Sequence, residues 1–306
     1  MPGRDACIVR RILAPLDGSR LAEAVLPSLI ALATRFGAEV ALLHVLEERP
    51  PATIHGEAHL ADLQAAEGYL QRAASRLADA GVSVELHAHE TREGSVAGSI
   101  VQHAVEMAPD LVVLCAHGSG GLRDLFIGRI AQQVLQRGAW PILMLQPAAD
   151  GSPVPFELSD ILAPVDGEHD QSGALRLASA LACAFGATLH LALAVPTPET
   201  LADARRRTGI TLPRTMRAIL DLAEEGAARD LAAMAAPCAQ RGATVRTTVL
   251  RGETVASLTG YADQIEAGLV VLATHGSTGI EAIVEASVAP RMAARLGRPI
   301  LFVKEA

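Results

Sequence analysis

Short apolar runs alternate along this chain with longer segments whose apolar residues recur every three to four positions. Leu111–Leu114 is apolar at four successive positions, which is typical of a strand buried on both faces of a sheet. The expected strands are 11–15, 40–45, 82–89, 111–114 and 141–145 in the first half, and 160–163, 188–194, 244–250, 269–272 and 299–303 in the second half. Helices are expected between them, including one from about residue 58 to residue 80. Strands that alternate with helices predict parallel, doubly wound sheets.

The chain contains an internal repeat. Ile12–Gly18 recurs as Ile161–Gly167, and Leu111–Ser119 recurs as Leu269–Ser277. The first two segments are 149 positions apart (161 minus 12) and the second two are 158 apart (269 minus 111), so the second copy holds an insertion of 9 residues (158 minus 149). Self-similarity of this kind, with the order of the motifs preserved, indicates a duplicated domain.

The duplication sets the expected domain boundaries. The first domain covers residues 1–148 and the second covers residues 158–306, with a linker near 149–157 that is interrupted by glycine and proline. The predicted fold class is α/β, with two tandem, five-stranded, parallel-sheet domains of the Rossmann-like type. We expect the two copies to pack about a pseudo-twofold axis with their last strands meeting edge to edge, because such pairing hides exposed strand edges.

Composition narrows the classes of function. Of the 306 residues, 50% are hydrophobic and 20% charged, which suits two ordinary globular cores. The net charge of −8 gives no general attraction for nucleic acid or for an anionic membrane, and no apolar run reaches the length of a membrane span. The four cysteines form no CxxC pair, which argues against a disulfide framework or a cysteine zinc cluster. A cytoplasmic location is expected.

Two segments with polar or glycine residues follow strands of the first copy. Asp17 comes after the first strand, and a glycine-rich loop from Cys115 to Gly121 comes after the fourth. In doubly wound sheets, ligands bind beyond the carboxyl ends of the strands, where the strand order reverses. Glycines let backbone amides approach an anion, and the helix expected to begin at Gly128 adds partial positive charge. The loop therefore predicts a phosphate site, although an ordinary strand-to-helix turn would have the same composition.

The arrangement of a strand, His117-Gly118, nine residues, Gly128 and a helix resembles the Gly-x-x-Gly-x(9)-Gly-Ser/Thr nucleotide signature of the universal stress protein family. The segment Ala14–Ser19 and a terminal Pro-Ile-Leu strand extend the resemblance over nearly the whole chain, in both copies. The resemblance implies a tandem universal stress protein with a fold like that of the adenine-nucleotide α-hydrolases. It also implies binding of ATP or a related adenine nucleotide, with or without Mg²⁺.

The resemblance also implies which residues contact the nucleotide. Asp17 would contact the ribose or adenine, the backbone at Val45 the adenine, and Gly118 and Gly128 the phosphates. In the second copy, the Ser287 hydroxyl would donate to a phosphate. The full set of implied positions is Asp17, Val45, Ala116, His117, Gly118, Gly128 and Arg129 in the first copy and Asp166, Ala194, Thr274, His275, Gly276 and Ser287 in the second copy.

Both copies depart from the family signature. In the first copy Cys115 stands at the first glycine and Arg129 at the Ser/Thr position, where its guanidinium can itself contact a phosphate. In the second copy Ala273 and Ala286 replace two of the three glycines, while Ser287 is retained. The first copy is therefore the better candidate for a nucleotide site.

The expected function is a nucleotide-binding stress or signalling module with at most slow ATP hydrolysis, rather than an enzyme. No nucleophile–base pair and no Walker motif is recognisable, and each copy places a single carboxylate at the binding edge. A nucleotide-free interaction module with degenerate loops is the first alternative. An adenylating enzyme would need a further catalytic motif. The protein partner is unspecified, and a homodimer of chains is left open.

Histidines gather in the first copy. Five of the ten lie between its second and fourth strands, and the corresponding stretch of the second copy has none. His87 and His89 alternate on a strand and share a face, so they could share a metal ion. The competing interpretation is an exposed strand edge. We therefore expect no metal site and no zinc, with a metal sensor as the second alternative and these two histidines as its candidates.

Overall fold

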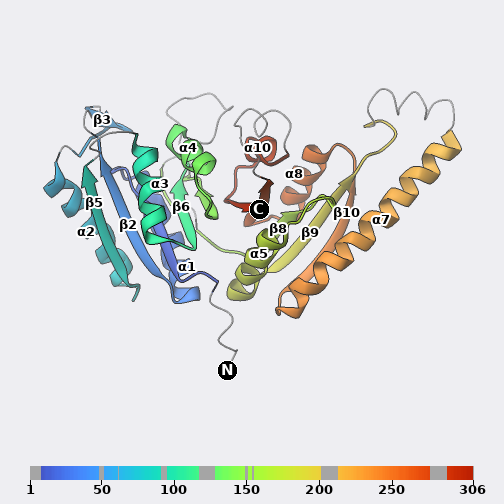
Figure 1. Cartoon of the computed structure of the whole chain (residues 1–306), viewed down its shortest axis with the longest axis horizontal. Helices are drawn as coiled ribbons and strands as arrows, with labels where there is room; N and C mark the ends of the chain where they lie inside the picture. Colours follow the sequence, from blue (N-terminus) through green and yellow to red (C-terminus); the bar gives the residue numbers. More distant parts are fainter. Residues whose placement is uncertain are drawn as a thin grey trace. The chain divides into compact units, whose positions relative to one another are not determined.

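The computed structural model describes residues 8–47, 52–60, 62–90, 95–116, 128–148, 151–153, 155–200, 213–275 and 288–305. The chain forms two compact units, residues 1–156 with 299–302 and residues 157–298 with 303–306 (Figure 1). Each unit is a mostly parallel sheet between layers of helices, which confirms the predicted fold class.

The first unit alternates strand and helix from its start. Its elements are β1 (Arg11–Pro15), the 3-10 helix η1 (Ala22–Val25), α1 (Leu26–Phe36), β2 (Glu39–Leu46), β3 (Thr53–Ile54), β4 (Glu57–Ala58), α2 (Leu63–Ala78), β5 (Val84–Glu90), α3 (Val96–Met107), β6 (Leu111–Cys115), α4 (Arg129–Arg137) and β7 (Ile142–Leu145). The strand order is β7-β6-β1-β2-β5, and all these neighbours are parallel.

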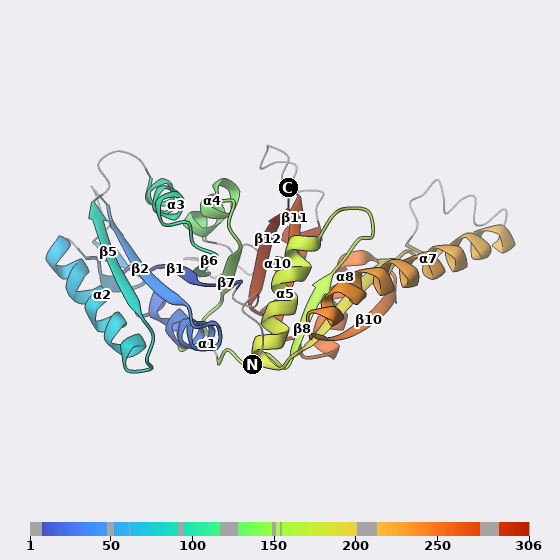
Figure 2. The ribbon, with the colours of Figure 1, turned by 60° about the horizontal axis from the view of Figure 1, so that its bottom comes forward.

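Helices cover both faces of the first sheet. Helices α1 and α2 lie on one face and α3 and α4 on the other (Figure 2). The central strands are apolar on both faces for this reason, and Ile12, Leu13, Leu42 and Leu43 are fully buried. Helix α1 ends at Gly37, whose φ of 65° is the left-handed conformation common at helix C-termini.

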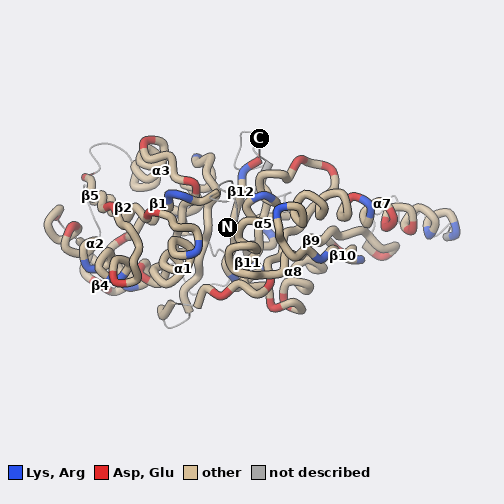
Figure 3. Tube along the Cα trace, turned by 90° about the horizontal axis from the view of Figure 1, so that it is seen from below, with Lys and Arg blue, Asp and Glu red and all other residues tan. Residues whose placement is uncertain are grey.

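The second unit repeats this arrangement. Its elements are β8 (Asp160–Pro164), α5 (Ser172–Phe185), β9 (Thr188–Val195), α7 (Pro213–Gln240), β10 (Thr244–Arg251), α8 (Thr254–Gln264), β11 (Leu269–His275), α10 (Val288–Ala293) and β12 (Ile300–Glu305). The parallel strands follow the order β10-β9-β8-β11, with α5 and α7 packed on one face and α8 and α10 on the other. Both signs of charge are interspersed along the 28-residue helix α7 (Figure 3).

The last strand is shared between the units. Residues 300–302 belong to the first unit, where Ile300, Leu301 and Phe302 pair antiparallel with Met144, Leu143 and Ile142 of β7. The sequence analysis counts this strand as the fifth of the second copy.

One element differs from the sequence-based expectation. The helix predicted from about residue 58 begins at Leu63, and residues 53–58 form the hairpin β3–β4 instead. His55 and Gly56 both have positive φ, 50° and 82°, which is the geometry of a two-residue hairpin turn. Asp62 then caps α2 by accepting a hydrogen bond from the Ala65 amide at 2.7 Å, which fixes the start of the helix. Within the described residues, no helix combines the length and apolar character needed to cross a bilayer.

Candidate functional site

The candidate site of the first unit lies where the strand order reverses. From β1 the chain continues through β2 to β5 on one side, and then returns to place β6 on the other side of β1. Asp17 follows β1 and Ala116 follows β6, so both predicted residues lie at the carboxyl edge next to this reversal. The Cys115 thiol at the end of β6 donates to the Leu21 carbonyl at 3.2 Å, so this strand end contacts the segment that follows Asp17.

A tight turn holds the Asp17 carboxylate. Its Oδ1 accepts hydrogen bonds from the Ser19 amide (2.9 Å) and the Ser19 hydroxyl (2.6 Å). The Ser19 hydroxyl oxygen in turn accepts a hydrogen bond from the Ala22 amide at 3.1 Å, at the start of η1. Gly18, between them, has a φ of 93°, which other residues adopt only with strain. The local sequence therefore fixes the carboxylate before any ligand arrives.

The β3–β4 hairpin lies against this carboxylate. His55 Nε2 is 3.5 Å from Asp17 Oδ2, and Glu57 Oε1 accepts a hydrogen bond from the Arg20 amide at 3.3 Å. Beyond the hairpin, Leu60 packs on Gly18, since a Cβ added there would lie 2.8 Å from Leu60 Cδ1. In this structure the chain itself thus occupies the Asp17 side of the candidate site. Sequence reasoning missed these contacts because it assigned the end of this segment to a helix.

A buried histidine lies beneath the same turn. His44 is 1% exposed, and its Nδ1–H donates to the Leu16 carbonyl at 2.7 Å, which leaves Nε2 without a hydrogen-bond partner among the described residues. Burial is the main cause that lowers the pKa of His44 below its ordinary value, so the ring is neutral. Burial likewise raises the pKa of the Cys115 thiol to about 12, with Asp17 adding to the effect, so this cysteine is an unreactive thiol.

Three further predicted residues of the first copy can be placed. Val45 is buried near the end of β2. Strand β2 continues to Leu46, whereas its hydrogen-bonded pairing with β1 ends at Leu43. Gly128 directly precedes α4, and Arg129 is the exposed first residue of that helix. The amides at this helix start suit an anion, and the guanidinium adds a charge. His117 and Gly118 lie outside the described residues.

Asp166, the equivalent aspartate of the second copy, makes different contacts. Asp166 Oδ1 accepts hydrogen bonds from the Glu168 and His169 amides at 3.0 and 3.1 Å, and Oδ2 contacts His169 Nδ1 at 2.7 Å. Burial alone would raise the pKa of Asp166, but these hydrogen bonds outweigh it and lower the pKa below its ordinary value. Both carboxylate oxygens are thus engaged within one turn.

The other predicted positions of the second copy are partly described. Ala194 lies near the end of β9, paired with Leu250, and the Thr274 hydroxyl at the end of β11 donates to the Val303 carbonyl at 3.4 Å. His275 is the last residue of β11, and its side chain is not among those described. Gly276 and Ser287 lie outside the described residues.

Comparison with protein families gives one result for both copies. The model of the universal stress protein family matches residues 9–146 and residues 158–304. Two curated relatives each match about one copy. Universal stress protein MJ0531 of Methanocaldococcus jannaschii is 26% identical over 144 residues, which are 45% of this chain and 83% of the relative. Universal stress protein YxiE of Bacillus subtilis is 27% identical over 149 residues, which are 44% of this chain and 98% of the relative.

Solved structures resemble the chain over nearly its full length. A universal stress protein from Archaeoglobus fulgidus aligns with a TM-score of 0.64 at 14% identity, covering 97% of this chain and 96% of that one. A putative universal stress protein from Pseudomonas aeruginosa aligns with a TM-score of 0.67 at 19% identity, covering 97% and 93%. At these identities the likeness is one of fold.

Proposed function

Because the chain belongs to the universal stress protein family and carries its domain twice, we propose that it binds an adenine nucleotide in the first copy and signals by its occupancy. The observation that carries the proposal is the Asp17 carboxylate, held by Ser19 at the reversal of strand order. A fixed carboxylate at that edge accepts hydrogen bonds from ribose hydroxyls. The start of α4, with Arg129, supplies amides and a cation for the phosphates.

The hairpin gives binding a structural consequence. A ribose hydroxyl that donates to Asp17 Oδ2 would compete with the His55 ring, which lies 3.5 Å from that oxygen. Leu60, packed on Gly18, belongs to the same segment and moves with it. Nucleotide occupancy would therefore shift the segment from His55 to Leu60, and that shift is what a protein partner would detect. A single carboxylate without a neighbouring base suits recognition better than rapid hydrolysis.

The second copy is the poorer candidate for nucleotide binding. Both aspartates have three contacts, but Asp166 Oδ2 lies 2.7 Å from His169 Nδ1 whereas Asp17 Oδ2 lies 3.5 Å from His55 Nε2, so a ribose would compete with a shorter contact in the second copy. We therefore expect the second copy to hold no nucleotide. This division corresponds to the nucleotide-free alternative, restricted to one half of the chain.

The test begins with the protein as purified. Small molecules released on denaturation are identified by mass spectrometry, and the stripped protein is titrated calorimetrically with ATP, cAMP and dAMP. The last two are chosen because universal stress proteins have been solved in complex with each of them. We expect one nucleotide per chain.

The matched variants Asp17→Asn and Asp166→Asn identify the copy that binds. Hydrogen bonds to a charged group contribute about 1.5–3 kcal/mol, so Asp17→Asn should weaken binding by roughly ten- to a hundredfold. Asp166→Asn should leave the affinity unchanged. Equal losses in the two variants would contradict the assignment to the first copy. No released nucleotide and no heat with any of the three probes would contradict the proposed function itself.

A further inference from the structure

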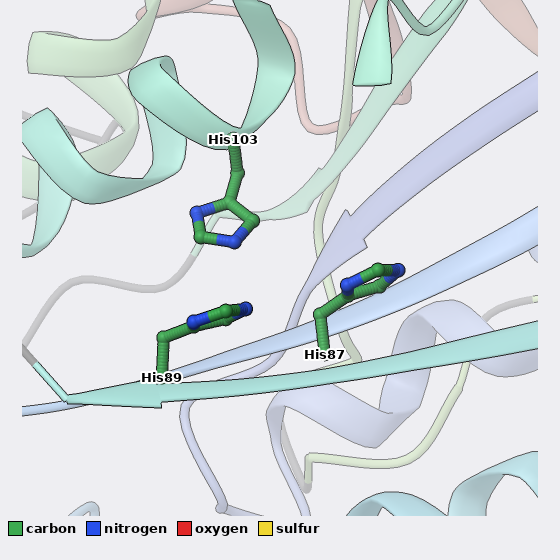
Figure 4. A group of neighbouring side chains, drawn as sticks. All are labelled: His87, His89 and His103. Carbon is green, nitrogen blue, oxygen red and sulfur yellow. The ribbon is translucent and has the colours of Figure 1, made fainter. Parts of the chain in front are cut away.

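We propose that His87, His89 and His103 form a binding site for a divalent transition-metal ion, for which zinc is the fitting choice. One ring nitrogen from each of the three lies within 4.8 Å of the other two. The three rings come together between β5 and α3, as Figure 4 shows. His89 is the register partner of Val45 on the neighbouring strand, but the three histidines share no residue with the candidate nucleotide site, and the inference does not depend on the proposed function.

The fold brings the three histidines together from two elements. His87 and His89 are two residues apart on β5, the edge strand of the first sheet, and so point to the same face. Helix α3 covers that face of the sheet and contributes His103 from above (Figure 4). The ring centroids of His89 and His103 are 4.2 Å apart, and those of His87 and His103 are 6.2 Å apart. The sequence offered two of these ligands, and the packing of α3 supplies the third.

The contacts of the other ring nitrogens suit metal binding. His103 Nδ1–H donates to the Ser99 carbonyl at 3.2 Å, so Nε2 carries the free lone pair. A hydrogen bond of this kind fixes the tautomer and orientation of metal-bound histidines. His87 Nε2 is buried, lies 3.6 Å from Glu85 Oε2, and has no hydrogen-bond partner in the described part of the chain. The Glu85 carboxylate at this distance can orient the His87 ring, as the Ser99 carbonyl orients that of His103.

The geometry fits a small four-coordinate ion. Zinc–nitrogen bonds are about 2.0–2.1 Å, so two ligands of a tetrahedral zinc are about 3.3 Å apart. The present separations of up to 4.8 Å must therefore close by at most about 1.5 Å. Rotation of the exposed His89 side chain can close the two separations that involve His89. Three histidines leave a fourth position for water or an exchangeable ligand, and imidazole ligands suit zinc, copper and nickel rather than magnesium or calcium.

The experiment uses the untagged full chain, stripped of metal with EDTA and then titrated with Co²⁺ as a spectroscopic probe. We expect the visible d–d bands of four-coordinate Co²⁺ to saturate at one equivalent and to disappear when Zn²⁺ is added. After dialysis against Zn²⁺ and then buffer, elemental analysis should find one zinc per chain. His103→Ala should remove the bands and weaken zinc binding by at least about tenfold, since even partners of the ligands contribute that much.

Val105→Ala is the matched control, since Val105 is 65% exposed on the same helix. This variant should bind Co²⁺ and Zn²⁺ as the unmodified chain does. Far-UV circular dichroism of His103→Ala checks that the fold is retained. An unmodified chain that shows no bands and retains no zinc overturns the proposal. Unchanged zinc affinity in both His103→Ala and His87→Ala also overturns it, because the metal would then be bound elsewhere.

Discussion

The two copies carry different side chains at the same place, the junction between an edge strand and the helix that follows it. His87 on β5 pairs with Leu43 of β2, and Thr248 on β10 pairs with Ala192 of β9. Leu43 and Ala192 are 149 positions apart (192 minus 43), the offset of the repeat at this point. His87 and Thr248 therefore occupy equivalent positions.

The helices on the other side of the junction are equivalent as well. Ser95 and Glu253 cap α3 and α8 by accepting a hydrogen bond from the amide three residues on. His103 and Tyr261 each lie eight residues after that cap (103 minus 95, 261 minus 253). The pair His87 and His103 in the first copy thus corresponds to Thr248 and Tyr261 in the second.

In the second copy these groups satisfy one another. The Tyr261 hydroxyl lies 3.0 Å from Thr248 Oγ1 and 3.0 Å from His190 Nδ1, and His190 Nε2 lies 2.8 Å from Asp160 Oδ1. The first copy has three imidazoles instead, and His87 Nε2 has no hydrogen-bond partner among the described residues. A network whose polar groups all have hydrogen-bond partners stabilises the fold, whereas polar groups that lack partners at the same place are suited to binding a ligand. The two copies share a backbone arrangement at this junction, but their polar side chains are suited to different roles.

The largest expected effect comes from opening the closed network. His190 is 3% exposed, so His190→Ala leaves a cavity and deprives Tyr261 and Asp160 of their partner. We expect this to cost about 3 kcal/mol of unfolding free energy. His103→Ala, at the equivalent junction of the first copy, should cost about 0.5 kcal/mol in the metal-free protein, because it breaks no closed network.

Urea unfolding with two probes separates the copies. Trp140, the only tryptophan, reports on the first unit by fluorescence, whereas circular dichroism reports on both. His190→Ala should lower the midpoint seen by circular dichroism and leave the Trp140 transition in place. If both transitions shift together, the units unfold cooperatively, and the copies are not the independent modules that the comparison assumes.

A smaller effect is expected at the glycine that follows each site aspartate. Gly18 and Gly167 have φ values of 93° and 74°, so alanine at either position costs about 1 kcal/mol in backbone strain. At Gly18 the added Cβ would also lie 2.8 Å from Leu60, whereas at Gly167 the nearest atom is Asp230 Oδ2 at 3.3 Å. Gly18→Ala should therefore cost the more, up to about 2 kcal/mol, and should loosen the hairpin segment.

The control for this pair is Gly37→Ala. Gly37 has a similar φ of 65°, but a Cβ there meets nothing within 4 Å, so it isolates the backbone strain. Hydrogen exchange of residues 53–60 measures the loosening directly. Faster exchange there in Gly18→Ala than in Gly37→Ala is expected. Equal exchange would mean that Leu60 does not hold the hairpin over Asp17.

The fold could be predicted from the sequence because the hydrophobic pattern that specifies each strand extends over consecutive residues. Runs such as Leu111–Leu114 are buried on both faces, and the repeat places each run a second time. It also placed Asp17 at the binding edge, because topology alone decides which strand ends lie together.

The contacts on those residues could not be predicted in the same way. His55 reaches Asp17 through a six-residue hairpin too short and polar to show a strand pattern, although Gly56 was a usable turn signal. His103 joins His87 and His89 only through the packing of α3 on the sheet, which no local pattern specifies. By contrast, His169 and Asp166 are only three residues apart in the sequence, so their contact could have been predicted from the Asp-Gly-Glu-His segment.

The smallest expected effect concerns the Asp166 carboxyl group. Its pKa in the folded chain lies below the ordinary value of 3.8, because hydrogen bonds from Glu168 and His169 outweigh its burial. A carboxyl group with a lowered pKa contributes stability that is present above about pH 4 and is lost as the pH falls through the folded value. His169→Ala removes the ring contact but leaves both backbone amides, so the pKa should rise toward 3.8 without reaching it. The titration is followed by carbon NMR of the Asp166 side chain. If His169→Ala leaves the pKa unchanged, the backbone turn alone holds Asp166, and the two copies differ less at this position than the His169 contact suggests.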